Sequence, residues 1–270
     1  MHNKTMHNRA LQIPAMNALP LYLHNGSALR LDLDAAQRLH IERKDLPERR
    51  IPLHHASRIV CSSTLDISAR ALMACMKSGI PVAVVDPSGN TLGWCLGARR
   101  KETSLRQLLT HALDDQAWPC HYPDWLQQQH AAVAAQTLLL CGVPTTAAAR
   151  NNPRAALCNA HFVKHQRGCA QPVDALTLLA QHELAAKLTQ ETGAPELLAW
   201  HRPGLNLIED LGKVIGLHAH TDLHHAPLLP EADKLTPWAI RNYERHAAHW
   251  QQRIGQLIYG FEQILRCHWQ

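Results

Sequence analysis

The chain has 270 residues, 46% of them hydrophobic, and carries a formal net charge of +5 at pH 7. This length accommodates one large domain or two modest ones, each able to bury its own core. The mildly basic balance is compatible with an anionic partner such as nucleic acid but does not require one. No apolar run approaches the roughly 18 residues of a membrane span and the N-terminus lacks a signal-peptide core, so we expect a soluble, cytoplasmic protein with no membrane partner.

Short apolar runs that alternate with polar residues predict strands in the first hundred residues. The candidate strands are 19–24, 28–33, 38–43, 49–53, 57–61, 80–85 and 91–96. Asn25-Gly26 between the first two predicts a hairpin. One helix is predicted over 66–78, where it ends at Gly79, a residue suited to a left-handed C-cap.

From about residue 99 onward, apolar residues recur every three or four positions, which predicts helices. The candidate helices are 104–113, 123–140, 173–192, 206–215 and 237–267. The predicted fold class is therefore α+β. A β-rich, sandwich-like domain is expected over 1–97, a linker over 98–104, and an all-α-helical domain over 105–270.

Cysteine and histidine usage bears on metal binding. The eight cysteines include no Cys-x-x-Cys pair, and most lie in apolar runs, as buried free thiols do. This indicates a reducing compartment and argues against a disulfide framework or a thiolate zinc site. The densest His/Asp cluster is His218, His220, Asp222, His224 and His225. Because the chain has 20 histidines, an exposed polar loop is a simpler interpretation of this cluster than a zinc site.

Two blocks of sequence carry a resemblance to a known family. The block 51–97 contains in order Ile67-Ser68 with Ala71-Leu72, Gly79-Ile80-Pro81-Val82, Asp86 with Gly89, and Leu92-Gly93. The block 172–215 contains Gly193 at a helix end, then His201, then Leu207-Ile208-Glu209-Asp210-Leu211. In order and spacing they resemble the CRISPR spacer-acquisition integrase family, Cas1 (Cas-one). The resemblance implies a β-domain followed by a helical domain, in agreement with the periodicity.

The resemblance also implies a chemistry, metal-dependent DNA strand transfer by an endonuclease/integrase. Such a site holds Mg²⁺ or Mn²⁺ with a Glu, a His and a further acid. His201 matches the His, and Asp210 matches the Asp of the family's Asp-Leu pair, but Lys213 occupies the acidic position. The stretch 142–150 matches the segment of the early Glu and places Pro144 there. We therefore expect a degenerate site with Mg²⁺, Mn²⁺ or no metal bound, and Lys213 paired with Asp210.

Basic residues suggest a surface for DNA. On the predicted last helix, Arg241, Arg245, His249 and Arg253 recur every four residues, a stripe suited to phosphate contacts. A solvated helix face paired with Glu244 is the alternative. A second basic patch is Arg99, Arg100 and Lys101 at the predicted domain junction.

The favoured hypothesis is a CRISPR adaptation protein that serves as a DNA-binding scaffold with a decayed metal site. The resemblance implies as partners DNA, the small adaptation protein Cas2 (Cas-two), and a second copy or an active paralogue in a dimer. Two alternatives remain open. One is an active metal-dependent DNA endonuclease or integrase that uses a displaced acidic set around His201 and Asp210, with Glu209 as a further candidate metal ligand. The other is a non-catalytic protein-assembly module.

Overall fold

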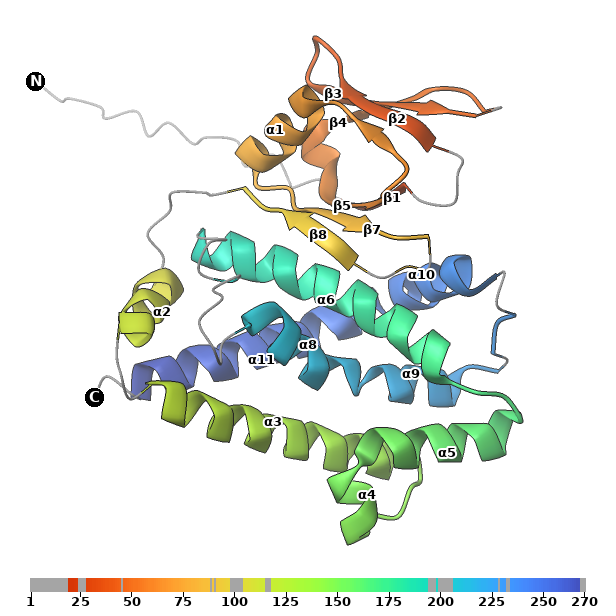
Figure 1. Cartoon of the computed structure of the whole chain (residues 1–270), viewed down its shortest axis with the longest axis vertical. Helices are drawn as coiled ribbons and strands as arrows, with labels where there is room; N and C mark the ends of the chain where they lie inside the picture. The colour runs from red at the N-terminus through yellow and green to blue at the C-terminus, as the bar shows by residue number, and fades with distance from the viewer. Residues whose placement is uncertain are drawn as a thin grey trace, which may run out of the picture.

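The computed structural model describes residues 19–23, 28–44, 46–87, 89, 91–97, 104–114, 118–193, 198, 206–227, 229–231 and 234–267. Strands occupy the N-terminal part of the chain and helices the remainder, and Figure 1 shows the strand-rich part seated against one side of the helical part. The predicted α+β class is thus confirmed. The predicted linker falls almost entirely on 98–103, outside the described residues. Among the helices of the described part, none is both long and apolar enough to cross a membrane.

The strands form two four-stranded sheets. The first has the order β1 (Leu19–Leu23), β5 (Ala56–Ser62), β7 (Val82–Val85) and β8 (Thr91–Cys95). The second has the order β4 (Arg49–Pro52), β3 (Arg38–Arg43), β2 (Ala28–Leu33) and β6 (Asp66–Ile67). The hairpin predicted at Asn25-Gly26 is wrong, because β1 pairs in parallel with β5 while β2 pairs with β3 and β6 in the other sheet.

Helix α1 (Ala69–Ser78) packs against the apolar core between the two sheets, and a 3₁₀ turn, η1 (Leu53–His55), precedes β5. The helix begins three residues later than predicted because Ser68 is its N-cap and accepts a hydrogen bond from the Ala71 amide at 3.1 Å. The preceding residues, Asp66–Ile67, pair with β2 instead. The predicted C-cap is confirmed, since Gly79 adopts φ 67°.

The helical part begins with α2 (Ser104–Asp114), α3 (Trp118–Leu140), α4 (Ala147–Asn151), α5 (Pro153–His165) and α6 (Ala170–Thr192). It continues with α8 (Leu207–Gly216), α9 (Ala219–His225), α10 (Leu235–Arg245) and α11 (Ala247–Cys267). The predicted single helix over 237–267 is wrong, because His246 ends α10. Its amide bonds the Tyr243 carbonyl at 3.0 Å, and its ring lies 3.2 Å from the Asn242 side-chain oxygen. The His246 amide thus bonds both the Asn242 and the Tyr243 carbonyls, and this tighter turn separates α10 from α11.

Helix α6 lies between the first sheet and the other helices, as Figure 1 shows beneath β7 and β8. On the sheet side, Leu178 packs against Val60, Ala83 and Val85. Helix α8 packs closely against α6, and this approach depends on small residues. A Cβ on Gly212 would lie 2.5 Å from the Gln181 side chain. Helix α6 therefore contacts both the first sheet and α8, and it sets their positions relative to each other.

A buried arginine joins the strands to the helices. Arg58 on β5, whose side chain is 6% exposed, forms an ion pair with Glu183 of α6. It also donates a hydrogen bond to the Tyr22 hydroxyl of β1 at 2.9 Å. That hydroxyl donates in turn to Glu244 of α10 at 2.8 Å, and Glu244 lies 3.6 Å from the guanidinium. This network links two strands to two helices through a single cation.

Candidate functional site

The N-terminus of α8 carries two of the predicted site residues, Glu209 and Asp210. Asn206 is the N-cap, and its side-chain oxygen accepts a hydrogen bond from the Glu209 amide at 3.2 Å. Asp210 reaches back to accept a bond from the Asn206 amide at 3.2 Å. The Asp210 carboxylate also accepts a hydrogen bond at 3.3 Å from the hydroxyl of Tyr122 on α3, a buried residue. Asp210 is therefore engaged in holding α8 to its own cap and to α3.

Lys213 extends from the next turn of α8. Its ammonium lies 2.8 Å from Glu209 Oε1, four residues earlier, and not beside Asp210 as expected. A Glu four residues before a Lys is the favourable helical arrangement, and Asp210 is already bonded to Tyr122 and to the cap. The hydrogen bond to Glu209 raises the pKa of Lys213, with a further contribution from the Asp210 charge. The Lys213 ammonium therefore pairs with Glu209, and its charge also acts on the Asp210 carboxylate.

The other two predicted site positions lie elsewhere or outside the description. Pro144 lies in the exposed turn between α3 and α4, where its carbonyl accepts a hydrogen bond from the Thr146 amide at 2.9 Å. Thr146 then caps α4 by accepting from the Ala149 amide. His201 lies outside the described residues, as do Arg99, Arg100 and Lys101. Among the predicted site positions that the structure describes, Glu209, Asp210 and Lys213 lie together on α8, and Pro144 lies apart from them.

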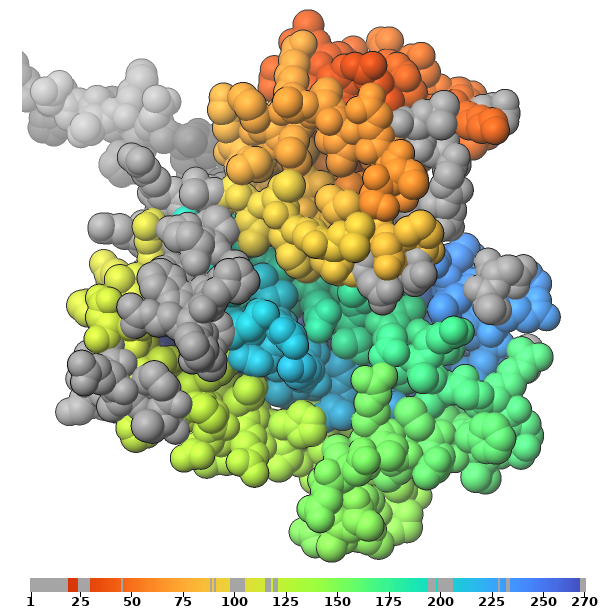
Figure 2. Space-filling view, in the orientation of Figure 1, coloured from red at the N-terminus to blue at the C-terminus, as the bar shows by residue number. Residues whose placement is uncertain are grey.

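A cavity of about 1100 Å³ lies beside α8, bounded by β5, β7, α6 and α10. Its charged and imidazole lining residues are Asp86, His130, Arg154, Asp174, His182, Lys213 and His220. Side chains of both charges line the cavity, and two of them, Arg154 and Asp174, form an ion pair at 2.5 Å. Figure 2 shows residues of α8 at the surface on the face viewed, beneath the strands. The acidic position that Lys213 occupies therefore faces a space large enough for a ligand.

The basic stripe predicted on one helix is divided between two. Arg241 and Arg245 are exposed on α10, and His249 is exposed on α11. Arg253 does not belong to this surface, because its side chain is only 9% exposed. It lies 3.8 Å from the buried Asp222 carboxylate, with its guanidinium 5.7 Å from the Trp250 ring. Three of the four predicted positions thus remain accessible to a phosphate backbone.

The His/Asp cluster predicted as an exposed loop is instead helix α9, and that interpretation was wrong. His218, His220 and Asp222 are buried, while His225 is exposed. Burial lowers the pKa of His218 to about 3, with smaller contributions from nearby cations, so its ring is neutral at pH 7. The alternation of apolar and His residues concealed this helix, because histidine is equally common on surfaces.

The sequence reasoning missed two features of the site. Tyr122 was not identified as the partner of Asp210, since nothing local in the sequence relates positions so far apart. A group of two thiols and one imidazole, Cys158, Cys169 and His220, was missed because its members come from three separate elements. Sequence spacing detects metal ligands when they share a loop or helix, and these do not.

Comparisons with known proteins identify one matching family model and several solved structures with a similar fold. A family model described as CRISPR associated protein Cas1 matches residues 22–123. No curated protein matches the chain. A solved structure of a CAS1 protein from Thermotoga maritima is similar with a TM-score of 0.69 at 13% identity, covering 92% of this chain and 97% of that one.

Two further solved structures share the fold. A complex of TtCas1 with DNA has a TM-score of 0.58 at 15% identity and covers 90% of this chain and 91% of that one. A casposase bound to its integration product has a TM-score of 0.56 at 10% identity, covering 84% of this chain and 82% of that one. At these identities, the likeness is one of fold.

Proposed function

We propose that this chain is a member of the family of CRISPR associated protein Cas1, and that it is a DNA-binding scaffold in CRISPR adaptation whose ancestral metal position no longer holds a catalytic ion. The observation that carries the second half of this proposal is the Lys213 ammonium 2.8 Å from Glu209 Oε1. It occupies with a fixed positive charge the helix turn where the family resemblance implies a metal-binding acid.

The described residues do not fit Mg²⁺ or Mn²⁺. These cations need several convergent oxygen donors. Glu209 is occupied by Lys213 and by the Asn206 side-chain amide, and Asp210 is occupied by the helix cap and by Tyr122. Pro144 offers no side-chain donor and lies in the α3–α4 turn. A single imidazole, that of His201, would remain, and one imidazole holds Mg²⁺ poorly.

DNA binding is supported by the fold relatives and by the exposed cations. A TtCas1–DNA complex and a casposase with its integration product have the same fold. Arg241, Arg245 and His249 are accessible on the adjoining helices α10 and α11. Contacts from such residues to phosphates give affinity that is independent of base sequence and sensitive to salt.

We further propose the two protein partners that the family resemblance implies. One is a second copy or an active paralogue that pairs through the strand-rich part, and the other is Cas2. A scaffold of this kind remains useful when the paired subunit supplies the chemistry. Native mass spectrometry of the chain alone and with each candidate measures these assemblies directly.

The experiment that tests the loss of metal binding restores the acids. Wild-type protein should bind Mn²⁺ weakly at millimolar concentration and should show no metal-dependent cleavage or strand transfer. The variant Lys213→Asp should bind Mn²⁺ measurably more tightly, as monitored by electron paramagnetic resonance of the free ion, because it frees Glu209 from its ion pair and adds an oxygen donor one turn further along α8. Pro144→Glu should have little effect, because position 144 lies in the exposed α3–α4 turn and not among the carboxylates of α8.

The matched control is Arg266→Asp, which reverses charge in another exposed i,i+4 ion pair, with Glu262 on α11. This variant should leave Mn²⁺ affinity unchanged, so a general charge effect is separated from restored ligands. Robust Mn²⁺-dependent integration by the unmodified protein, abolished in Asp210→Ala, would overturn the proposal. It would instead establish the alternative of an active enzyme with a displaced acidic set.

A further inference from the structure

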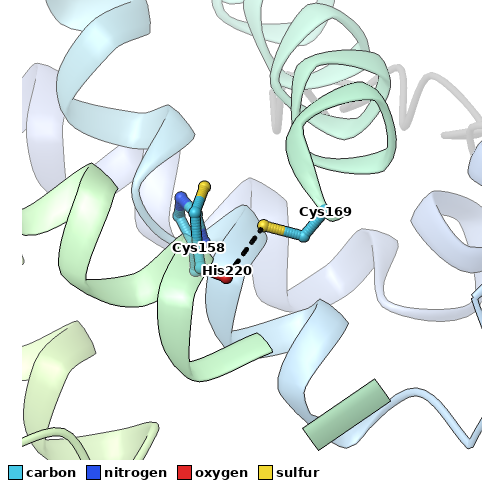
Figure 3. Close-up of side chains that lie close together, drawn as sticks. All are labelled: Cys158, Cys169 and His220. Carbon is cyan, nitrogen blue, oxygen red and sulfur yellow. Dashed lines mark hydrogen bonds between the residues drawn. The ribbon is translucent and has the colours of Figure 1, made fainter. Parts of the chain in front are cut away.

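Two thiols and one imidazole converge at a point where three helices meet. Cys158 lies on α5, Cys169 is the N-cap residue of α6, and His220 is the second residue of α9. One ligand atom from each lies within 4.8 Å of the others. Figure 3 shows the Cys169 side chain directed toward Cys158 and His220, although the three residues are separated by up to 62 positions in the sequence.

The donors in this cluster have few other interactions. The Cys169 thiol makes a long contact, 4.0 Å, with the Cys158 carbonyl, and a side-chain interaction with Cys158 helps to raise its pKa. The imidazole of His220 is 1% exposed, and its Nδ1 is buried without a hydrogen-bond partner. Buried polar atoms in folded proteins are nearly always bonded, so an unpaired one indicates a missing ligand or water. His161 stacks on His220 with ring centroids 5.4 Å apart, which holds that ring in place.

We propose that Cys158, Cys169 and His220 bind a Zn²⁺ ion through two thiolate sulfurs and one imidazole nitrogen. Zinc–sulfur bonds of about 2.3 Å and zinc–nitrogen bonds of about 2.0 Å in a tetrahedron require donor separations of about 3.5–3.8 Å. The observed spacing needs a contraction of no more than about 1.3 Å from its 4.8 Å limit, within the reach of side-chain rotation. His220 borders the cavity beside α8, so water can reach the fourth position.

The local electrostatics suit a neutral complex. Two thiolates balance the charge of Zn²⁺. Burial raises the pKa of the Cys169 thiol to about 12, while the Arg154 guanidinium opposes that rise, so zinc binding releases a proton from Cys169. Burial lowers the pKa of His220 to about 3, with contributions from His161 and Arg154, which leaves the ring neutral and able to bind metal.

The consequence for the fold is a metal crosslink among α5, α6 and α9. Helix α9 packs against both α5 and α6, and each of the three helices contributes residues to the lining of the cavity beside α8. Because no residue of α8 is a ligand, this site does not depend on the state of the ancestral metal position. A protein that has lost one metal site can therefore retain another of different chemistry.

The test uses the full chain, purified with a phosphine reductant and without chelator. Metal analysis should find about one zinc per chain. Cobalt(II), substituted for zinc, should give intense thiolate-to-cobalt charge-transfer absorption that one equivalent of Zn²⁺ removes. Cys158→Ser and Cys169→Ser should each weaken Co²⁺ affinity by more than about 100-fold, beyond the loss expected for an outer hydrogen bond.

The matched control is Cys75→Ser, which alters a buried thiol of α1 in the strand-rich part and should leave the cobalt spectrum unchanged. Cys158 is only half-buried, so its serine variant should stay folded, and circular dichroism checks this. Absence of charge-transfer bands in the wild-type protein would overturn the proposal. Bands that persist in the Cys158→Ser, Cys169→Ser double variant would do so as well.

Discussion

Replacing Arg58 by Ala should destabilise the protein far more than replacing an exposed arginine. The substitution leaves the Glu183 carboxylate, 16% exposed, beside α6 without its cation. Removing one partner of a buried ion pair costs about 3–5 kcal/mol. For a chain of this size, that corresponds to a fall in Tm of roughly 6–10 °C. Differential scanning calorimetry measures the change directly.

Arg38→Ala is the matched control, since the Arg38 side chain is 41% exposed and pairs with Asp34 at 2.7 Å. An exposed pair contributes about 0–1 kcal/mol, so this variant should remain close to wild type. The double variant Arg58→Met with Glu183→Leu should recover much of the loss, because it removes both buried charges together. A Tm for Arg58→Ala within about 2 °C of Arg38→Ala would refute the view that this network joins the strands to the helices.

Three further predictions concern backbone fit, pH and DNA. Gly97→Ala should destabilise the strand-rich part in thermal unfolding, because the new Cβ would lie 1.7 Å from a carbonyl oxygen of α1. Burial, with a smaller effect of the Arg58 charge, lowers the pKa of His182 to about 3. Between pH 6.5 and 3 this imidazole therefore binds a proton in the unfolded chain but not in the folded protein. Stability measured by urea titration should therefore fall from pH 6.5 towards 3, by up to about 1.4 kcal/mol per unit from this ring, and His182→Gln should flatten that slope. Replacing Arg241 and Arg245 together by Ala should reduce the slope of log K against log salt for duplex DNA by about 1.8, equally for all sequences, and an unchanged slope would remove them from the interface.

The sequence predicted those elements whose signals are local. Ser68 and Gly79 mark the ends of α1 by their capping chemistry, and period-two alternation located the strands to within a residue or two. Strand pairing was not predictable in this way. Asn25-Gly26 favours a hairpin locally, but β1 pairs with β5 in the first sheet instead. This pairing joins strands far apart in the sequence, so the residues of the turn do not indicate it.

In the candidate site, too, local features could be predicted from the sequence and long-range contacts could not. The substitutions at Pro144 and Lys213 are visible in the sequence, because they are single positions in recognisable segments. The partner of Lys213 was predicted wrongly, since the choice between Glu209 and Asp210 depends on Tyr122, which arrives from α3. The burial of Arg253 likewise depends on Asp222 of α9. Tertiary contacts, and not helical spacing, determine which charges remain free.

The edges of the second sheet affect how the protein behaves at high concentration. An open edge strand offers unpaired amides and carbonyls to any other chain, which is a common route to aggregation. Here one edge is β4, which exposes Arg49 and Arg50 and ends at Pro52, a residue with no amide to donate. The other edge, β6, is only two residues long. Copies of this chain are therefore protected against edge-to-edge stacking through this sheet, and any contact between copies that uses it has to form through packed side chains.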